Sequence, residues 1–152
     1  MKKALLLFAM AFIAISVNAQ KVKEEAVPPA IKASFERAHP NVKVDKWEKE
    51  GNNYEAEYMD NKVETSASFG PNGQVLDVET EIAVSALPKA VSDYCAKNMP
   101  GKKIKEASKI TDAKGAISYE AEVDEADYIF DANGAFIKKE VEAKEADDED
   151  KK

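Results

Sequence analysis

Carboxylates are the most numerous side chains in this sequence that carry chemistry, and many of them recur at every second position. Asp and Glu together number 29, against 22 Lys and Arg. The alternating carboxylates are Glu55, Glu57, Glu64, Glu79, Glu81, Glu120 and Glu122. General acid–base catalysis needs two carboxyl groups whose environments separate their pKa values, and clustered oxygen ligands also suit calcium. The regular alternation with apolar residues instead favours the solvated face of a sheet, with divalent-cation binding as the alternative.

A cysteine–histidine pair is the second chemistry to consider, because Cys95 and His39 each occur once. Cys95 lies on the apolar stripe of a predicted helix, which predicts a buried thiol that packs as a small hydrophobic group. One Cys and one His also exclude an intrachain disulfide and zinc sites built from several such ligands. No phosphate-binding glycine loop or Gly-x-Ser-x-Gly motif is present. The sequence therefore predicts no catalytic residue, no metal site and no cofactor.

The single tryptophan is the strongest candidate for a recognition residue. Val42 and Val44 share one side of a predicted strand, and Trp47 falls on the other side unless a bulge intervenes. An exposed tryptophan among charged residues is typical of an interface anchor. The candidate interface consists of Trp47 with Lys46, Glu48 and Lys49. The alternative is that a bulge turns Trp47 into the core or between repeats.

The first 19 residues have the pattern of a secretory signal peptide. A positive head is followed by the uncharged apolar run 4–15, and the small residues Val17 and Ala19 precede the expected cut. That run is shorter than the roughly 20 residues that a membrane-spanning helix needs. We expect cleavage after Ala19 and a periplasmic or secreted location.

The net charge of the chain limits the classes of partner that it can bind. Removal of residues 1–19 takes away two lysines and changes the net charge from −7 to −9. An acidic chain without a basic cluster is a poor ligand for nucleic acid or for an anionic membrane. After signal cleavage we therefore expect neither nucleic acid nor membrane as a partner, and the length of 152 residues suits one domain.

The chain contains an internal duplication. Fourteen of 43 aligned positions are identical when 27–50, 54–58 and 69–82 are paired with 87–110, 119–123 and 130–143. We therefore divide the chain into a signal peptide (1–19), an N-terminal segment (20–26), repeat one (27–82), repeat two (87–142) and an acidic tail (143–152). The tail carries five acids and three lysines without apolar periodicity, which predicts disorder.

Each repeat predicts one helix followed by four antiparallel strands. Pro28 and Pro88 suit helix starts, and Pro40 and Pro100 end the helical pattern. Period-two alternation follows, with hairpin turns at 71–73 and 132–134. A 56-residue unit buries too little surface alone. The predicted fold is therefore α+β, with two tandem helix-plus-four-strand repeats forming one antiparallel sheet and both helices on one face.

The motifs of the two repeats also resemble a known family. The first repeat contains Val27-Pro28-x-Ala30, Pro40, Trp47-Glu48-Lys49-Glu50-Gly51, Tyr54-Glu55-Ala56-Glu57 and Phe69-x-x-x-Gly73. The second contains Leu87-Pro88-x-Ala90-Val91, Pro100-Gly101, Tyr119-Glu120-Ala121-Glu122 and Phe130-Asp131-x-x-Gly134. Over roughly 27–142, this order resembles the PepSY-like, beta-lactamase-inhibitor-like family of exported bacterial proteins. The resemblance implies a tandem-repeat fold with a curved sheet like that of the beta-lactamase inhibitor protein, a periplasmic or secreted location, and no catalytic residues to carry over.

These observations predict a binding protein. With both helices on one face, the other face of the sheet is open to a partner. We expect an exported, non-enzymatic binding module for a protein of the cell envelope, which acts in protein–protein interaction or as an inhibitor-like protein. The alternative is a periplasmic protein that binds a small ligand or a divalent cation. Partner identity and oligomeric state do not follow from the sequence.

Overall fold

The computed structural model describes residues 15–17 and 19–142, and it contains a ten-stranded sheet and two α-helices. The strands are β1 (Ile15–Val17), β2 (Ala19–Val22), β3 (Val44–Glu50), β4 (Asn53–Asp60), β5 (Val63–Phe69), β6 (Val75–Glu81), β7 (Ala107–Asp112), β8 (Ile117–Glu122), β9 (Asp127–Asp131) and β10 (Phe136–Glu142). The helices are α1 (Pro29–Ala38) and α2 (Lys89–Asn98), and the 3₁₀ turns η1 (Glu24–Ala26) and η2 (Val84–Ala86) precede them. The predicted acidic tail, 143–152, lies outside the described residues.

The sheet follows the order of the chain. Strands β3 to β10 are neighbours in sequence order, and every pair among them is antiparallel. The pairing of β6 with β7 joins the two repeats into one sheet. The predicted tandem arrangement of one helix and four strands is therefore confirmed.

Two further strands flank the predicted eight. β2 pairs antiparallel with β3, and β1 pairs parallel with β10, with Ile15 opposite Glu140. β1 and the first residue of β2 fall within the predicted signal peptide. Cleavage after Ala19 would remove β1 and leave the outer edge of β10 without that strand.

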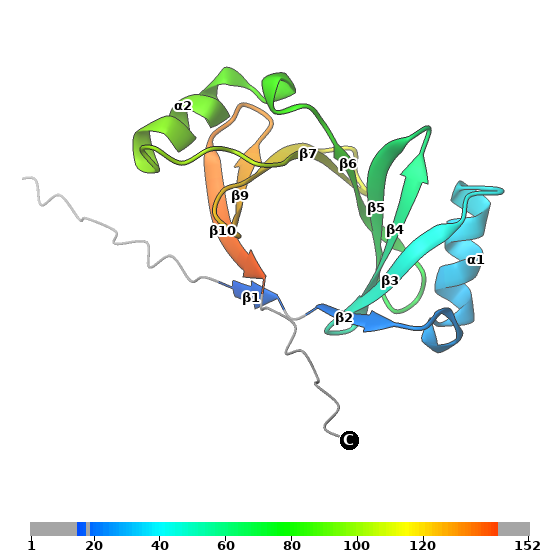
Figure 1. Ribbon diagram of the computed structural model, residues 1–152. Helices are drawn as coiled ribbons and strands as arrows, with labels where there is room; N and C mark the ends of the chain where they lie inside the picture. Colours follow the sequence, from blue (N-terminus) through cyan, green and yellow to red (C-terminus); the bar gives the residue numbers. More distant parts are fainter. Residues whose placement is uncertain (1–14, 18, 143–152) are drawn as a thin grey trace, which may run out of the picture.

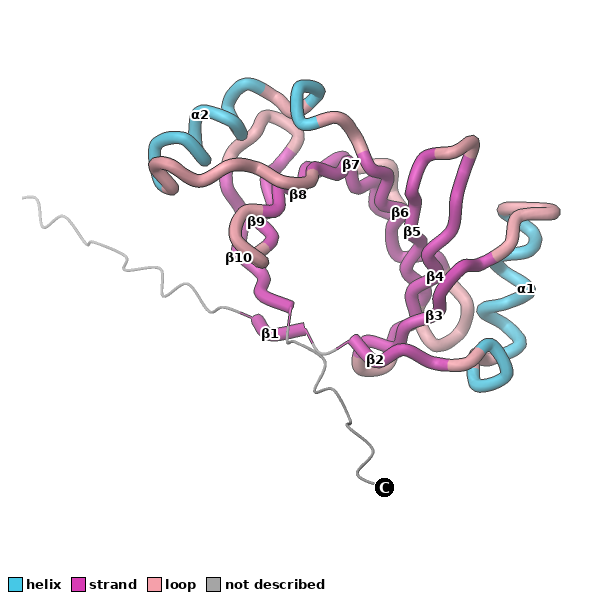
Figure 2. Tube along the Cα trace, in the orientation of Figure 1, coloured by secondary structure: helices cyan, strands magenta, loops and turns pink. Residues whose placement is uncertain are grey.

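The sheet curls strongly, and the helices lie on its outer side. Figures 1 and 2 show the strands arranged around an open centre, with α1 and α2 both on the convex face. The right-handed twist of each strand accumulates over many antiparallel neighbours and produces such curvature. The prediction that both helices occupy one face is confirmed.

Local sequence explains each helix. Pro29 occupies the first turn of α1, where the missing N–H has no intrahelical partner in any case. Ile31 and Phe35 are four residues apart, so they bury the same side of the helix. The helix ends before Pro40, and the His39 amide donates to the Phe35 carbonyl. α2 repeats this pattern with Val91 and Cys95 as its buried residues.

Each helix packs against the strands of its own repeat, and the two repeats therefore have separate cores. The core of repeat one consists of Val27, Ile31, Phe35, Trp47, Ala56, Tyr58, Ala67 and Phe69. The core of repeat two consists of Leu87, Val91, Cys95, Ala107, Ala121, Val123 and Phe130. The strands contribute four buried alanines to these cores: Ala56, Ala67, Ala107 and Ala121. Most apolar side chains therefore pack on the convex side, and the concave side is mostly polar but includes Ile110, Ile129 and Ile137.

Candidate functional site

The concave face of the sheet forms a wide acidic cavity of about 1410 Å³. Among the described residues that line it, fifteen are Asp or Glu and three are Lys. The carboxylates are Glu48, Glu50, Glu55, Glu57, Glu64, Asp77, Glu79, Glu81, Glu106, Asp112, Glu120, Glu122, Glu125, Asp127 and Glu140. The lysines come from outer strands: Lys21 from β2, Lys46 from β3 and Lys138 from β10. Strands β4 to β9 contribute carboxylates and no lysine to this described lining.

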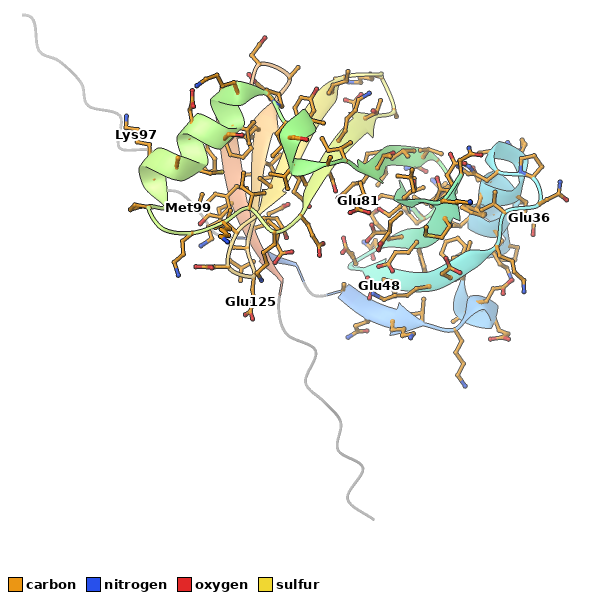
Figure 3. All side chains as sticks on the ribbon, turned by 45° about the horizontal axis from the view of Figure 1, so that its top comes forward. Glu36, Glu48, Glu81, Lys97, Met99 and Glu125 are labelled. Carbon is orange, nitrogen blue, oxygen red and sulfur yellow. The ribbon has the colours of Figure 1, made fainter. Side chains whose placement is uncertain are left out.

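Strand geometry places these carboxylates together. Successive side chains on a strand point to opposite faces, so Glu55 and Glu57 line the cavity while Ala56 and Tyr58 enter the core. Figure 3 shows Glu48 and Glu81 on the inner side of the curved sheet and Glu36 on α1 outside it. The sequence predicted the alternation of carboxylates with apolar residues, but it did not predict that the inner face is concave. Because of this concavity, the central carboxyl groups are partly buried.

Serine hydroxyls lie between the central carboxyl groups. On neighbouring strands, Ser66 lowers the pKa of Glu55, Ser68 that of Asp77 and Ser108 that of Glu79. Burial raises the pKa of Asp77. Burial, together with the negative charges of neighbouring glutamates and against the opposing effect of Ser66, raises the pKa of Glu55 to about 7. The floor of the cavity therefore combines serines with carboxyl groups that are partly protonated near neutral pH, and Ile110 and Ile129 lie beside them.

Glu79 and Glu120 form a carboxyl pair on this floor. The interaction between their side chains lowers the pKa of Glu79 and raises that of Glu120. Burial and the negative charges of Glu79 and Asp127 raise the pKa of Glu120 to about 9. The pKa of Glu79 is also raised overall, chiefly by burial. Close carboxyl groups share a proton because the doubly ionised pair is unfavourable.

Two of the cavity's lysines are engaged by carboxylates near the ends of the sheet. Lys46 Nζ lies 2.7 Å from Glu48 Oε1 and 3.1 Å from Glu57 Oε1. Burial opposes the charge of Lys46, but its bonds to Glu48 and Glu57 outweigh this and hold its pKa above the usual range. Lys138 forms an ion pair with Glu140. The negative charge of the middle strands is therefore not offset by a lysine from those strands within the described lining.

Trp47, the predicted anchor, lies in the core of repeat one. It is only 5% exposed, and its ring centroid lies 6.0 Å from that of Phe35 and 6.3 Å from that of Phe69. A register shift between Val44 and Lys46 changes the facing of the strand, so the expectation of an exposed Trp47 is wrong and the bulge alternative is correct. The charged neighbours separate: Lys46 and Glu48 line the cavity. Lys49 lies instead near the Tyr54 ring, with its Nζ 5.9 Å from the ring centroid.

Cys95 and His39 lie in different repeats. Cys95 is 6% exposed within the core of repeat two, which confirms the predicted buried thiol, and burial raises its pKa. The His39 Nε2 lies 3.2 Å from the Tyr58 hydroxyl in repeat one. The structure thus gives each residue a packing environment and does not assemble them into a nucleophilic pair.

The described residues contain neither a metal-ligand cluster nor a membrane-spanning helix. No group of three or more His, Cys, Asp or Glu side chains within the described part of the chain is arranged to hold a metal ion. No helix in the same part of the chain is long and apolar enough to cross a membrane.

The sequence signal for the central site was present but incomplete. Glu79 and Glu120 belong to the alternating carboxylates, and Ser66, Ser68 and Ser108 share their facing in the strands. Reading the serines together with the acids would have indicated a small, polar floor. The contact between Glu79 and Glu120 spans β7, so only the sheet curvature and register bring it about.

The fold is a tandem-repeat sheet with an acidic concave face, and comparison with known proteins identifies its family. Residues 13–66 and 52–138 match the family described as "Putative beta-lactamase-inhibitor-like, PepSY-like". The chain belongs to this PepSY-like family. Among curated proteins, none matches the sequence.

Solved structures share the fold at low sequence identity. A "putative periplasmic" protein from Bacteroides eggerthii has a TM-score of 0.63 at 15% identity, covering 74% of this chain and 87% of its own. A DUF2874 family protein from Bacteroides uniformis has a TM-score of 0.62 at 19% identity, with the same coverages of 74% and 87%. A BLIP-like protein from Bacteroides fragilis has a TM-score of 0.56 at 21% identity, covering 74% of this chain and 84% of its own. At these identities the likeness establishes the fold.

Proposed function

We propose that this protein is an exported, non-enzymatic binding module whose concave face receives a cationic segment of a partner protein. The observation that carries this proposal is the lining of the cavity, where fifteen carboxylates accompany three lysines among the described residues. Membership of an inhibitor-like family supports recognition over catalysis. A cell-envelope protein is the expected class of partner.

The shape of the cavity, as well as its charge, favours a cationic ligand. A concave surface lined by one sign of charge concentrates its field and attracts ligands of opposite charge, which raises the rate of association. A lysine- or arginine-rich loop entering this cavity would relieve repulsion among the carboxylates. Its backbone and methylene groups would also meet the small serine side chains of the floor, which leave room for a close approach.

Two observations support export. The first 19 residues carry the secretory pattern described above, and a structural relative from Bacteroides eggerthii is described as "putative periplasmic". We propose that the working form begins at Gln20 and acts in the periplasm or outside the cell. N-terminal sequencing of the protein recovered from its native envelope fraction tests this start.

The proposed recognition can be tested with a defined basic peptide. Fluorescently labelled decalysine is titrated with residues 20–152 at pH 8 and low salt, and anisotropy reports binding. We expect saturable binding that weakens as salt screens the charges. The double variant Glu64→Lys/Glu81→Lys reverses two exposed charges of the cavity and should weaken binding at least tenfold.

A matched control separates the cavity from net charge. Glu36→Lys/Glu24→Lys makes the same charge change on the exposed side chains of α1 and η1, which do not belong to the described lining of the cavity. We expect its affinity to stay within about threefold of the wild type. Equal losses in the two double variants, or no saturable binding by the wild type, would overturn the proposal. Circular dichroism melting confirms that each variant is folded.

The small-ligand or cation alternative is tested in the same experiment. Carboxylate oxygens favour calcium chemically, so calcium chloride and spermine are titrated in place of decalysine with thermal unfolding as the readout. A saturable rise in melting temperature with either compound, without decalysine binding, would favour the alternative over a protein partner.

A further inference from the structure

We propose that a pocket at the C-terminal end of α2, on the convex side of repeat two, binds a small aromatic carboxylate, a compound with one ring and one anionic group. The pocket has a volume of about 320 Å³, and none of its described lining residues also lines the concave cavity. The inference therefore concerns a second site and does not rest on the proposed function.

The lining of the pocket changes from apolar to charged between its floor and its mouth. Val123 is 2% exposed and forms the floor, and the half-buried Met99 and Tyr128 form the walls. Figure 3 shows Met99 at the end of α2. The exposed residues at the mouth are Asn98, Pro100, Lys102, Asp124 and Lys139. Apolar walls with a few polar groups are typical of sites for small molecules.

The two repeats build the helix end beside this pocket on the same backbone. In α1 the amide of His39 donates to the Phe35 carbonyl at 2.8 Å, and in α2 the amide of Met99 donates to the Cys95 carbonyl at the same distance. Both cap residues also have similar dihedral angles, with φ −129° and ψ 67° for His39 and φ −132° and ψ 60° for Met99. The side chains at these positions can therefore be compared directly.

The strand next to the helix end also corresponds between the repeats. Ala56 of β4 and Ala121 of β8 are both fully buried in their cores. Tyr58 and Val123 lie two positions further along and point to the same face as these alanines. Val123 therefore occupies in repeat two the position that Tyr58 occupies in repeat one.

Repeat one shows which chemical group fits this position. Tyr58 is only 1% exposed, and its ring centroid lies 5.0 Å from that of Phe35 and 4.7 Å from that of His39. Its hydroxyl lies 3.2 Å from the His39 Nε2. A phenol ring thus packs against the end of the helix in repeat one.

Repeat two replaces these three rings by side chains without rings. Val123 stands in place of the tyrosine, Cys95 in place of the phenylalanine and Met99 in place of the histidine. Tyr128 of β9 takes part of the space, and the pocket of about 320 Å³ lies beside it. An incoming aromatic ring can therefore pack here as the phenol ring of Tyr58 does in repeat one.

The same comparison shows that cations have been added at the mouth. Lys102 and Lys139 correspond to Val42 and Val78, which pack against the core of repeat one. The backbone confirms the first correspondence, because the amides of Val42 and Lys102 donate to the carbonyls of His39 and Met99 respectively. The second follows from register, since Val78 lies opposite Ala67 and Lys139 lies opposite Tyr128.

One of these two cations is available to an anionic ligand. Lys102 Nζ lies 2.7 Å from a carboxylate oxygen of Asp124, so its charge is balanced within the mouth. Lys139 Nζ lies 5.3 Å from the centroid of the Tyr128 ring. A ligand ring stacked on Tyr128 and beside the Met99 sulfur would place its carboxylate near Lys139. The ring and the charge together define an aromatic carboxylate.

Two-dimensional NMR tests the site with a defined probe. Labelled residues 20–152 are titrated with 4-hydroxyphenylacetate at pH 7, and we expect saturable shifts at residues 98–102 and 123–128 with a dissociation constant of about 0.1–1 mM. Tyramine has the same ring with a positive charge, and cyclohexylacetate has the same charge without an aromatic ring. Each should bind at least about threefold more weakly.

Three variants examine the ring position and the cation separately. Val123→Tyr restores the residue of repeat one and fills the pocket from within, so it should weaken binding by about tenfold or more. Lys139→Gln should weaken binding about threefold without loss of stability, because the residue is exposed. Lys97→Gln makes the same charge change on the exposed surface of α2, outside the described lining, and should leave the affinity unchanged.

The outcomes are distinct from those of the proposed function, which decalysine tests at the concave face. Shifts that do not saturate, or that lie outside the two segments, would overturn this inference. Equal effects of Lys139→Gln and Lys97→Gln would also overturn it, as would unchanged affinity in a folded Val123→Tyr protein. Thermal melting establishes whether each variant is folded, and the exposed Lys139 tests the site even where Val123→Tyr does not fold.

Discussion

Trp47 illustrates how one residue's facing changes its role. The strand parity set by Val42 and Val44 would have exposed it, but the bulge before Lys46 rotates it into contact with Phe35 and Phe69. Its indole therefore contributes to the core of repeat one, and the neighbouring Lys46 and Glu48 carry the charged lining of the cavity. Under the proposed function, the charged neighbours of Trp47 would contact the partner in place of the indole.

Replacement of Trp47 should act on stability first. Trp47→Ala removes a buried aromatic side chain, and such truncations typically cost about 3–5 kcal/mol. We expect a loss of this size in the free energy of unfolding, measured by urea denaturation with circular dichroism. Lys49→Ala is the control and should change stability by less than about 0.5 kcal/mol. A Trp47→Ala protein of nearly wild-type stability that has lost decalysine binding would restore the exposed-anchor interpretation.

At the scale of elements, the hairpin turns hold each helix against its sheet. Gly134 in the β9–β10 turn has φ +81°, and a Cβ added there would lie 2.8 Å from the Ala90 Cβ of α2. Gly73 in the β5–β6 turn has φ +80°, and a Cβ there would lie 2.6 Å from the Ala30 carbonyl oxygen of α1. Each of these two positions therefore requires glycine for two reasons: the positive φ of the backbone and the close approach of the helix.

A pair of substitutions separates these two requirements. Gly134→Ala should lose stability through both positive φ and collision with α2. Gly115 has the same φ, +81°, with nothing within 4 Å of an added Cβ, so Gly115→Ala incurs the backbone strain alone. We expect about 1–2 kcal/mol for Gly115→Ala and at least about 1 kcal/mol more for Gly134→Ala. Equal losses in urea denaturation would show that the turn does not constrain α2.

At the scale of the whole molecule, curvature concentrates charge that each strand carries only sparsely. Figure 1 shows the strands of both repeats directed around one centre, and the inner side chains of β3 to β10 all contribute to the described lining of the cavity. The repulsion among these groups is a property of the curved sheet as a whole. It should therefore appear in the pH dependence of folding.

The raised pKa values determine the direction of that dependence. A carboxyl whose folded pKa is above its unfolded value stabilises the fold fully below the unfolded value, and this stabilisation is lost as pH rises through the folded value. For Glu120 the loss develops between about pH 4.5 and 9. The stability difference between Glu120→Gln and the wild type should therefore grow in favour of the variant as pH rises from 5 to 9.

Thermal or urea unfolding at several pH values measures this difference. Glu36→Gln, on the outer surface of α1, is the control, and its stability difference from the wild type should stay constant over the same range. A constant difference for Glu120→Gln as well would show that the carboxyl pair does not hold a proton in the folded protein.

The sequence by itself determined the repeats, the order of helix and strands, the hairpin turns and the acidic inner face, because these depend on short-range periodicity and on residues such as Pro28, Asn72 and Gly73. Cys95 was also predictable, because helical spacing alone places it on the buried stripe. The tertiary structure decided the facing of Trp47, because a bulge changes strand parity by a single residue. It also decided the contact between Glu79 and Glu120, because their separation depends on register across β7 and on curvature summed over the whole sheet, neither of which is encoded within one short segment.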